Sequence, residues 1–269
     1  MEKFRIWRIF PAFGALISGF FLLVAVVFTS KTLPDDPAPV ILPPVAANPY
    51  GAADFAYNEQ GYLTCRTGES ILGIDVSEHQ GDIDWAQVKA AGVEFVIIRV
   101  GGRGYGTGKI FGDSRAAEYY AGAKAAGLQV GAYFFSQAVD IWEAKEEALF
   151  LLEAIAGWEV DLPLVFDWEY VSADARTGNM DADTLTECAR VFSRAVERAG
   201  YEAMIYFNLY QARDLIRLEK LTDLRWWLAR YAEDMGFDYS VDFWQYSCTG
   251  TVPGIWGDVD LNLWFPKTK

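Results

Sequence analysis

The stretch LQVGAYFFSQAVDIWEAKEEALFLLEAIAGWEVDLPLVFDWE (128–169) contains two apolar runs separated by a helical pattern. The runs at 128–135 and 163–169 are short and rich in β-branched and aromatic residues, which is typical of buried strands. The pattern between them covers 141–156, and Gly157 follows as a stop signal. Its apolar face consists of Ala144, Ala148, Leu151, Leu152 and Ile155. A strand, a helix and a second strand in this order predict two parallel neighbouring strands.

The same alternation extends in both directions along the chain. Further strands are predicted at ILGIDVS (71–77), EFVIIRV (94–100), AMIYF (203–207), WWLARY (226–231), VDFWQYS (241–247) and 258–263. Helices are predicted at 85–91, 114–126, 141–156, 184–199 and 209–216. Eight strands, with helices after the first five, predict an α/β fold in which a parallel sheet closes into a barrel. In such barrels the chemistry gathers at the C-terminal ends of the strands.

Acidic residues stand at the ends of several predicted strands. Asp167 and Glu169 are two residues apart, so their side chains point the same way, with about 6.6 Å between their Cα atoms. Two carboxylates this close do not both ionise freely, so one keeps its proton near neutral pH. Glycoside hydrolysis needs such a pair, because one carboxylic acid protonates the leaving oxygen while a carboxylate stabilises the positive charge that develops at the anomeric carbon. The other interpretation is a salt-bridged structural pair or a metal site, although this strand has no basic residue.

Other candidates are weaker on their own. Asp75, at the end of the first strand, also suits a turn or a helix cap, and Asp258 and Asp260 share one face of the last strand. His79 is the only histidine, and we interpret it as a structural residue or a contact at the rim. The chain has no GxSxG motif for a serine nucleophile. The glycine run GGRGYGTG (101–108) fits neither GxGxxG nor GxxxxGK[ST], so we interpret it as a flexible loop at the barrel mouth.

The composition excludes several classes of function. The formal net charge of −14 argues against a nucleic-acid partner, because binding phosphates requires clustered Lys and Arg. It fits a neutral sugar chain better than a polyanion. The three cysteines form no CxxC motif or Cys/His cluster, so we expect no zinc site and at most one disulfide. Cys188 falls on the apolar face of the 184–199 helix and is expected to be a buried free thiol.

The N-terminus differs in composition from the rest of the chain. Basic residues precede an uncharged apolar run over 12–28, which as a helix would span roughly 26 Å, just enough for a bilayer core. We expect residues 1–30 to form a cytoplasmic basic start and a transmembrane signal anchor, with a cleaved signal peptide as the alternative. Residues 31–53 are rich in proline and are expected to be an extended extracytoplasmic linker to a barrel at 54–269. The barrel would then lie outside the cell, tethered to the membrane by a single span, or secreted after cleavage.

Eight short motifs occur in one order between residues 71 and 265. They are GIDVSEHQGDIDW, RVGGRGYGTG, GAYFFSQA, LVFDWE, IYFN, WLARY, FWQYS and GDVDLN. This set resembles the glycoside hydrolase family 25 lysozymes, the Chalaropsis-type muramidases. Each motif alone is weak, but the combination of DVSxxQG, DWE and a late VDxN is specific. Phe134 and Gly102 depart from residues common in the family, and these departures bear on substrate subsites rather than on activity.

The resemblance implies an irregular (β/α)5(β)3 TIM-like barrel. It also implies hydrolysis of the β-1,4 bond between N-acetylmuramic acid and N-acetylglucosamine in peptidoglycan. Glu169 would be the general acid, and Asp167 its partner, acting as a nucleophile or orienting the acetamido oxygen of the substrate. Asp75 and Asp260 would be the other acids of the site. The residues expected to contact the sugar are Tyr133, Tyr206, Tyr231 and Trp244.

The resemblance implies no cofactor and no metal. The expected partners are peptidoglycan glycan strands and, through the N-terminal helix, a lipid bilayer, and we expect a monomer. Two other functions stay open. A catalytically inactive cell-wall-binding module would have no chemical reason to keep the acids. Another barrel glycosidase, such as a chitinase, would carry DxxDxDxE, whose first aspartates are missing before Asp167, where Leu164, Val165 and Phe166 stand.

Overall fold

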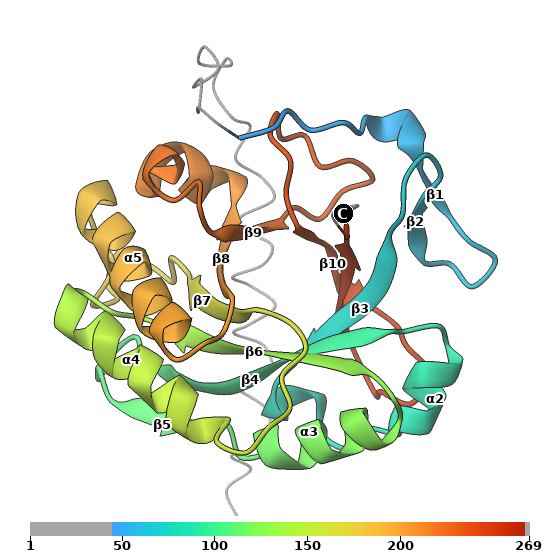
Figure 1. Ribbon diagram of the computed structural model, residues 1–269, viewed down its shortest axis with the longest axis horizontal. Coiled ribbons are helices and arrows are strands. Elements are labelled where there is room, and N and C mark those ends of the chain that lie inside the picture. Colours follow the sequence, from blue (N-terminus) through green and yellow to red (C-terminus); the bar gives the residue numbers. More distant parts are fainter. Residues whose placement is uncertain (1–44, 267–269) are drawn as a thin grey trace, which may run out of the picture. The chain divides into compact units, whose positions relative to one another are not determined.

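A closed barrel of eight strands forms the centre of the computed structural model, which describes residues 45–266 (Figure 1). The sheet closes because β3 pairs with both β4 and β11. The barrel strands are β3 (Ile71–Val76), β4 (Phe95–Arg103), β6 (Gln129–Ser136), β7 (Leu164–Trp168), β8 (Ala203–Asn208), β9 (Arg225–Ala229), β10 (Phe243–Gly250) and β11 (Val259–Trp264). A short strand, β5 (Ile110–Gly112), extends the sheet beside β4. The predicted closure into a barrel is therefore confirmed.

The barrel strands from β3 to β10 are parallel to their neighbours, whereas β11 runs antiparallel to both β10 and β3. The expectation of a parallel sheet is therefore wrong for the last strand. The connection explains the difference. Within the described residues no helix lies between β10 and β11, so the chain turns back and pairs with the strand that it has just left.

Helices follow the first four barrel strands and cover the outside of the barrel (Figure 1). They are α2 (Trp85–Ala90), α3 (Ala116–Ala125), α4 (Ile141–Ala154) and α5 (Ala182–Arg198). Three of them begin at an aspartate whose carboxylate accepts hydrogen bonds from two backbone amides. These caps are Asp84, Asp140 and Asp181. The glycines predicted to end the helices all have positive φ, as a left-handed helix end requires: Gly92, Gly127, Gly157 and Gly200.

A fifth helix, expected over 209–216, is only a π-helical turn at Gln211–Leu215. Side-chain contacts of Gln211 determine the local backbone. Its amide donates to Asn208 Oδ1 at 3.0 Å, and its Oε1 accepts from the Asn208 amide at 2.8 Å. A segment this short does not offer the several turns over which a helical pattern stabilises a helix.

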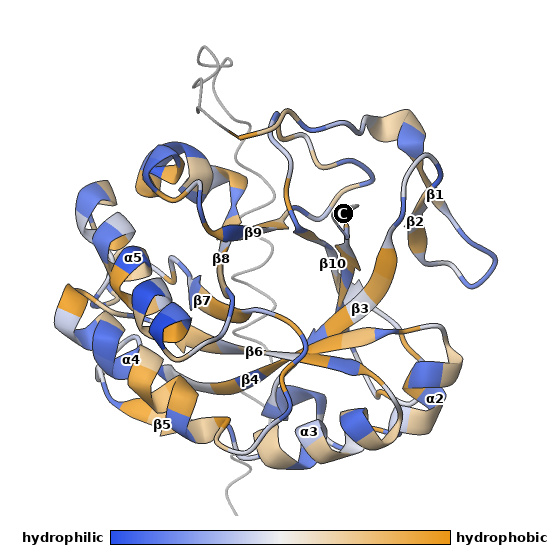
Figure 2. Cartoon of the chain, viewed as in Figure 1, coloured by the Kyte–Doolittle hydropathy of each residue, from blue (hydrophilic) through white to orange (hydrophobic). Residues whose placement is uncertain are grey.

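Side chains alternate between two cores along each barrel strand. On β7, Leu164, Phe166 and Trp168 face an outer core between the strands and the helices, whereas Val165 faces the barrel interior. Figure 2 shows β3 and β6 as mostly hydrophobic, whereas α4 and α5 combine hydrophobic and hydrophilic residues. The outer core also contains Cys188, which is buried as predicted, and all three cysteines are free. The inner core includes Phe95, Ile97, Val165, Met204, Trp227 and Phe243.

A hairpin that the sequence pattern did not predict lies before the barrel. Its strands, β1 (Phe55–Tyr57) and β2 (Leu63–Cys65), form a separate antiparallel sheet. Strands of three residues are too short to establish a period of two, so their alternation is not recognisable in the sequence. Part of the expected linker also contacts the barrel domain, since the Asn48 side chain donates to the Phe237 carbonyl at 3.0 Å.

The rest of the expected linker, and the apolar run over 12–28, lie outside the described residues. Within residues 45–266, no helix is both long enough and apolar enough to cross a membrane. The expected transmembrane anchor therefore stays a sequence-based prediction.

The glycine run at 101–108 is only partly the loop that we expected. Its first three residues belong to β4 and pair with β5. A Cβ atom at Gly101 would lie 2.5 Å from the Phe111 carbonyl oxygen, so the close approach of the two strands requires glycine. Arg103 ends the strand and pairs with the fully buried Glu147 at 2.7 Å. The run is therefore a β-hairpin held by a buried ion pair.

Candidate active site

Four carboxylates gather at the end of the barrel where the parallel strands finish. Asp75 lies on β3 and Asp167 on β7, while Glu169 follows directly after β7 ends at Trp168. Asp260 lies at the start of β11, opposite Asp75, because β11 runs in the reverse direction. Side-chain alternation turns all four residues inward, in series with the apolar residues of the inner core. The structure thus brings together the four acids singled out from the sequence.

Asp75 is the most firmly held of the four carboxylates. Its Oδ2 accepts hydrogen bonds from Gln245 Nε2 and Asn262 Nδ2, both at 2.8 Å. Burial raises the pKa of Asp75 to about 6, against the opposing effect of these two hydrogen bonds. The Asn262 side chain is itself fixed, since its Oδ1 accepts from Trp227 Nε1 at 2.9 Å. Asp75 is therefore oriented before any substrate arrives.

Among the residues that the structure describes, neither Asp167 nor Glu169 has such a donor at its carboxylate. Asp167 is 5% exposed, and its Oδ1 is buried without a hydrogen-bond partner among the described residues. Burial, and then the charge of Glu169, raise the pKa of Asp167 well above its ordinary value. Burial, and then the charge of Asp75, raise the pKa of Glu169 to about 7. Burying a carboxylate without a hydrogen-bond partner costs free energy. We therefore expect this pair to interact with a group that the chain itself does not supply.

Asp260 completes the set. Burial raises its pKa well above the ordinary value, and the charges of Asp75 and Glu169 act in the same direction. Four acids whose charges repel one another titrate as a unit, because each ionised carboxylate opposes the ionisation of the next. Among residues 45–266, no group of three or more His, Cys, Asp or Glu is arranged to hold a metal ion.

Two buried glutamines hold the backbone that carries the acid pair. Gln137 Nε2 donates to the Glu169 carbonyl oxygen at 2.7 Å, and Gln211 Nε2 donates to the carbonyl oxygen of Trp168. Both glutamines are fully buried. Gln137 is fixed in turn by Thr177, whose hydroxyl donates to Gln137 Oε1 at 2.8 Å. Analysis of the sequence missed both residues, because neither lies near the acids in the chain.

Three of the tyrosines singled out from the sequence lie beside the acids. Tyr206 and Tyr231 both donate to Gln245 Oε1, at 2.8 Å and 3.2 Å. Since Gln245 Nε2 bonds to Asp75, the glutamine connects two tyrosines to one acid. Tyr133 is partly buried against the inner core, and desolvation followed by the charge of Asp75 raises its pKa. Tyr231 is 53% exposed, which leaves its ring accessible at the barrel opening.

A protein-family model matches the part of the chain that forms most of the barrel and carries three of the four acids. The model for "Glycosyl hydrolases family 25" matches residues 74–255, which is more than half of the chain and includes Asp75, Asp167 and Glu169. The chain belongs to this family. Asp260 lies five residues beyond the matched range, on the strand that pairs with Asp75.

Known proteins resemble the family 25 domain along most of its length. An autolytic lysozyme from Clostridium acetobutylicum is 30% identical over 193 residues, which cover 71% of this chain and 55% of the relative. The bacterial lysozyme from Streptomyces coelicolor has a similar structure, with a TM-score of 0.58, 27% identity, and coverage of 73% of this chain and 92% of that one.

The modular autolysin LytC from Streptococcus pneumoniae, in complex with a synthetic peptidoglycan ligand, shares the fold. Its TM-score is 0.65 at 23% identity, covering 82% of this chain and 52% of LytC. The chain thus spans only about half of the length of LytC and of the clostridial relative.

Trp244, one of the predicted site residues, does not lie beside the four acids. Trp244 was expected to contact substrate, but it is fully buried in the outer core, where its ring lies 5.0 Å from that of Phe55. The expectation is wrong because Trp244 alternates with Phe243 and Gln245, which face the interior. His79 lies exposed on a short 3-10 helix after β3.

A buried cation near the acids was not predicted. Arg99, in the middle of β4, pairs with Asp113 at 2.8 Å and with Glu78 at 3.4 Å. Its charge acts to lower the pKa of Asp167, but burial and the neighbouring carboxylates outweigh it. Because Arg99 has its own acidic partners, it does not neutralise the acid cluster.

Proposed function

We propose that this chain is a peptidoglycan hydrolase of the lysozyme type. It would cleave the β-1,4 bond between N-acetylmuramic acid and N-acetylglucosamine by carboxylate catalysis. The observation that carries the proposal is the pair formed by the buried Asp167 and the partly buried Glu169, whose pKa values are both raised and which form no ion pair among the described residues. The family match and the lysozyme relative support the same reaction class.

Glu169 is the general acid in this proposal. A group that donates a proton near neutral pH needs a pKa close to 7, and the pKa of Glu169 is raised to about 7. Its carbonyl is fixed by Gln137, so the side chain starts from an oriented backbone. It would protonate the glycosidic oxygen as the bond to the anomeric carbon breaks.

Asp167 faces the positive charge that develops on the sugar ring. Its unpartnered Oδ1 would either attack the anomeric carbon or orient the acetamido group of the substrate. Detection of a sugar–enzyme adduct at Asp167 by mass spectrometry, using a slowly hydrolysed fluorinated substrate, selects the nucleophile role. A turnover that requires the acetamido group and leaves no adduct selects the orienting role.

Asp75 and Asp260 complete the site without acting as proton donors. The charge of Asp75 raises the pKa of both Glu169 and Asp260. The aromatic wall beside them provides flat apolar surface for sugar rings. In this proposal Tyr133, Tyr206 and Tyr231 contact the substrate, and Trp244 does not.

The test uses the full chain with purified peptidoglycan and with chitin. Release of reducing ends at muramic acid from peptidoglycan, lost in Glu169→Gln, is the expected result. An inactive wall-binding module would sediment with peptidoglycan without releasing reducing ends. Cleavage of chitin in preference to peptidoglycan would instead indicate another glycosidase, and either result would refute the proposal.

We also propose that the enzyme works at a membrane. The support is the apolar run over 12–28, which follows basic residues and precedes a proline-rich stretch. Fractionation of cells that express the chain should find it in the membrane pellet, extractable by detergent and not by salt. Recovery from the medium, with an N-terminus beyond residue 30, would show that the segment is a cleaved signal peptide.

A further inference from the structure

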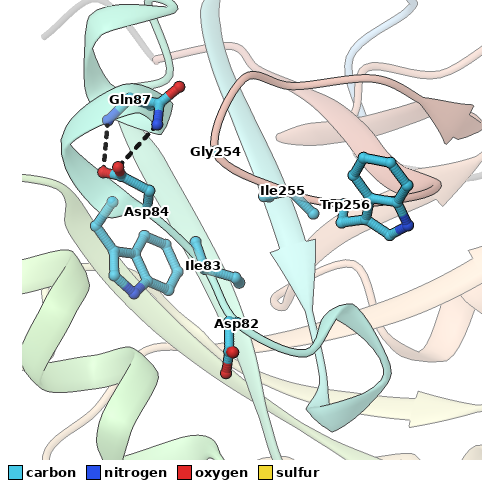
Figure 3. A pocket seen from close by; sticks show the side chains of 8 residues that line it. Asp82, Ile83, Asp84, Gln87, Gly254, Ile255 and Trp256 are labelled. Carbon is cyan, nitrogen blue, oxygen red and sulfur yellow. Dashed lines mark hydrogen bonds between the residues drawn. The ribbon is translucent and has the colours of Figure 1, made fainter.

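A cavity that contains none of the four acids opens at the same end of the barrel as the acid cluster. It has a volume of about 700 Å³ and lies between the segment after β3 and the loop that joins β10 to β11. Figure 3 shows its labelled side chains, with Trp256 projecting from the β10–β11 loop. The residues that matter for the argument are Asp82, Ile83, Asp84, Gln87, Ile255 and Trp256. None of them belongs to the acid cluster.

The walls of this cavity are joined to one another. Ile83 forms a β-bridge with Ile255, and the Asp84 amide donates to the Gly254 carbonyl oxygen at 2.8 Å. Gly254 has a φ of +93°, and a Cβ atom there would lie 2.4 Å from the Asp84 carbonyl oxygen. Only glycine allows this close approach. The two segments therefore form one fixed rim, and the cavity exists before a ligand binds.

The rim is continuous with the strands that carry two of the acids. The segment with Asp82 follows directly after β3, on which Asp75 lies. The loop with Trp256 leads directly into β11, on which Asp260 lies. Gln80 Nε2 ties the two sides together by donating to the Asp258 carbonyl oxygen at 3.3 Å. Trp256 precedes Asp260 by four residues, so the cavity adjoins the strand ends at which a polymer bound at the acids would lie.

The chemistry of the cavity suits a sugar ring. Trp256 is 93% exposed, although an indole of this size gains free energy when its apolar surface is covered. Pyranose rings present an apolar C–H face that stacks on such a surface. Asp82, held by Arg115 at 2.5 Å, and Gln87, held by Asp84 at 2.8 Å, offer oxygens to hydroxyl and amide donors.

We propose that this cavity is a distal sugar subsite, where a ring of the same glycan strand stacks on Trp256. The inference rests on the proposed function for the identity of the polymer. The subsite adds affinity for long strands and takes no part in bond cleavage. Its occupant is the glycan and not the peptide that peptidoglycan carries.

The experiment compares Trp256→Ala with Trp142→Ala in the full chain. Trp142 is a suitable control because it is 72% exposed on α4, on the outside of the barrel. The substrates are long peptide-free glycan strands and a tetrasaccharide of the same repeat. With long strands, Trp256→Ala should raise KM by about five- to tenfold at unchanged kcat. With the tetrasaccharide, and for Trp142→Ala, we expect no change, whereas Trp256→Phe should recover part of the affinity.

A binding measurement distinguishes a failure of this inference from a failure of the proposed function. In a Glu169→Gln background, sedimentation with peptide-free strands measures the subsite without turnover. A loss of strand binding on Trp256→Ala supports the subsite even if the wild-type chain hydrolyses nothing. Equal binding with and without Trp256 overturns the inference, as does an equal loss in the Trp142→Ala control or a loss that appears only with peptide-bearing strands.

Discussion

Glu169→Gln should abolish activity and yet make the folded protein more stable above neutral pH. The carboxyl of Glu169 has a pKa of about 7 in the folded protein, against an ordinary value of 4.5. Between these two pH values the folded chain binds more protons than the unfolded chain. Stability therefore falls as pH rises through this window, and the full cost is present above pH 7. Glutamine carries no charge, so the variant avoids this cost.

The magnitude follows from the size of the shift. Each unit of pKa difference corresponds to about 1.4 kcal/mol, so a rise from 4.5 to about 7 gives an upper limit of about 3 kcal/mol. The side chain is partly exposed, and water screens part of this effect. We therefore expect Glu169→Gln to raise the free energy of unfolding by about 1–2 kcal/mol at pH 8, and to change it little at pH 4.

Urea unfolding at pH 4, 6 and 8 measures this difference directly. A matched control is Glu69→Gln, since Glu69 is an exposed carboxylate in the turn after β2. The control should show no stabilisation that grows between pH 4 and pH 8. If Glu169→Gln were no more stable than wild type at pH 8, or if its advantage did not grow with pH, the raised pKa of Glu169 would be refuted.

Three further predictions concern the reaction. Asp167→Asn should lower kcat by about 10²–10⁴-fold, and a substrate whose leaving group needs no proton should rescue Glu169→Gln but not Asp167→Asn; an equal response of the two variants would contradict their assigned roles. The pH profile of kcat should be bell-shaped with an alkaline limb near pH 7, where Glu169 loses its proton, and a rate that stays flat up to pH 9 would exclude it as the donor. Gln137→Leu should lower kcat by about tenfold at unchanged KM, because the Glu169 carbonyl loses its donor, and unfolding curves will show whether a loss of stability explains the change instead.

The sequence was sufficient for the parts of the fold that follow periodic rules. Strand–helix alternation predicted the barrel, and glycines marked the helix ends, because both depend on neighbours in the chain. The same rule of alternation placed Asp167 and Glu169 on one side of β7. Applied to β10, it would also have excluded Trp244, since Phe243 and Gln245 on either side face the interior. The prediction for Trp244 was wrong because it relied on the residue type and neglected the position on the strand.

Contacts between distant segments could not be predicted in this way. Gln137 and Gln211 bind backbone carbonyls of a strand that lies far away in the chain, and carbonyls leave no signal in the sequence. Gln245 was also missed, although it faces inward on β10 and bonds to Asp75. A buried polar residue in phase with the inner core is the signal that could have found it. The pairing of β11 with β3 depends on closure of the barrel and is likewise a long-range property.

The arrangement of charge explains why the acid cluster keeps its protons. Arg99 lies close enough to act on the pKa of Asp167, and a direct pair between them would favour the ionised carboxylate. Instead, the guanidinium of Arg99 pairs with Asp113 and Glu78. The carboxylates are thus left to repel one another in a buried site, which favours the protonated form. Because Arg99 pairs with other acids, a proton donor stays available at neutral pH. The same raised pKa lowers the stability of the folded protein at that pH.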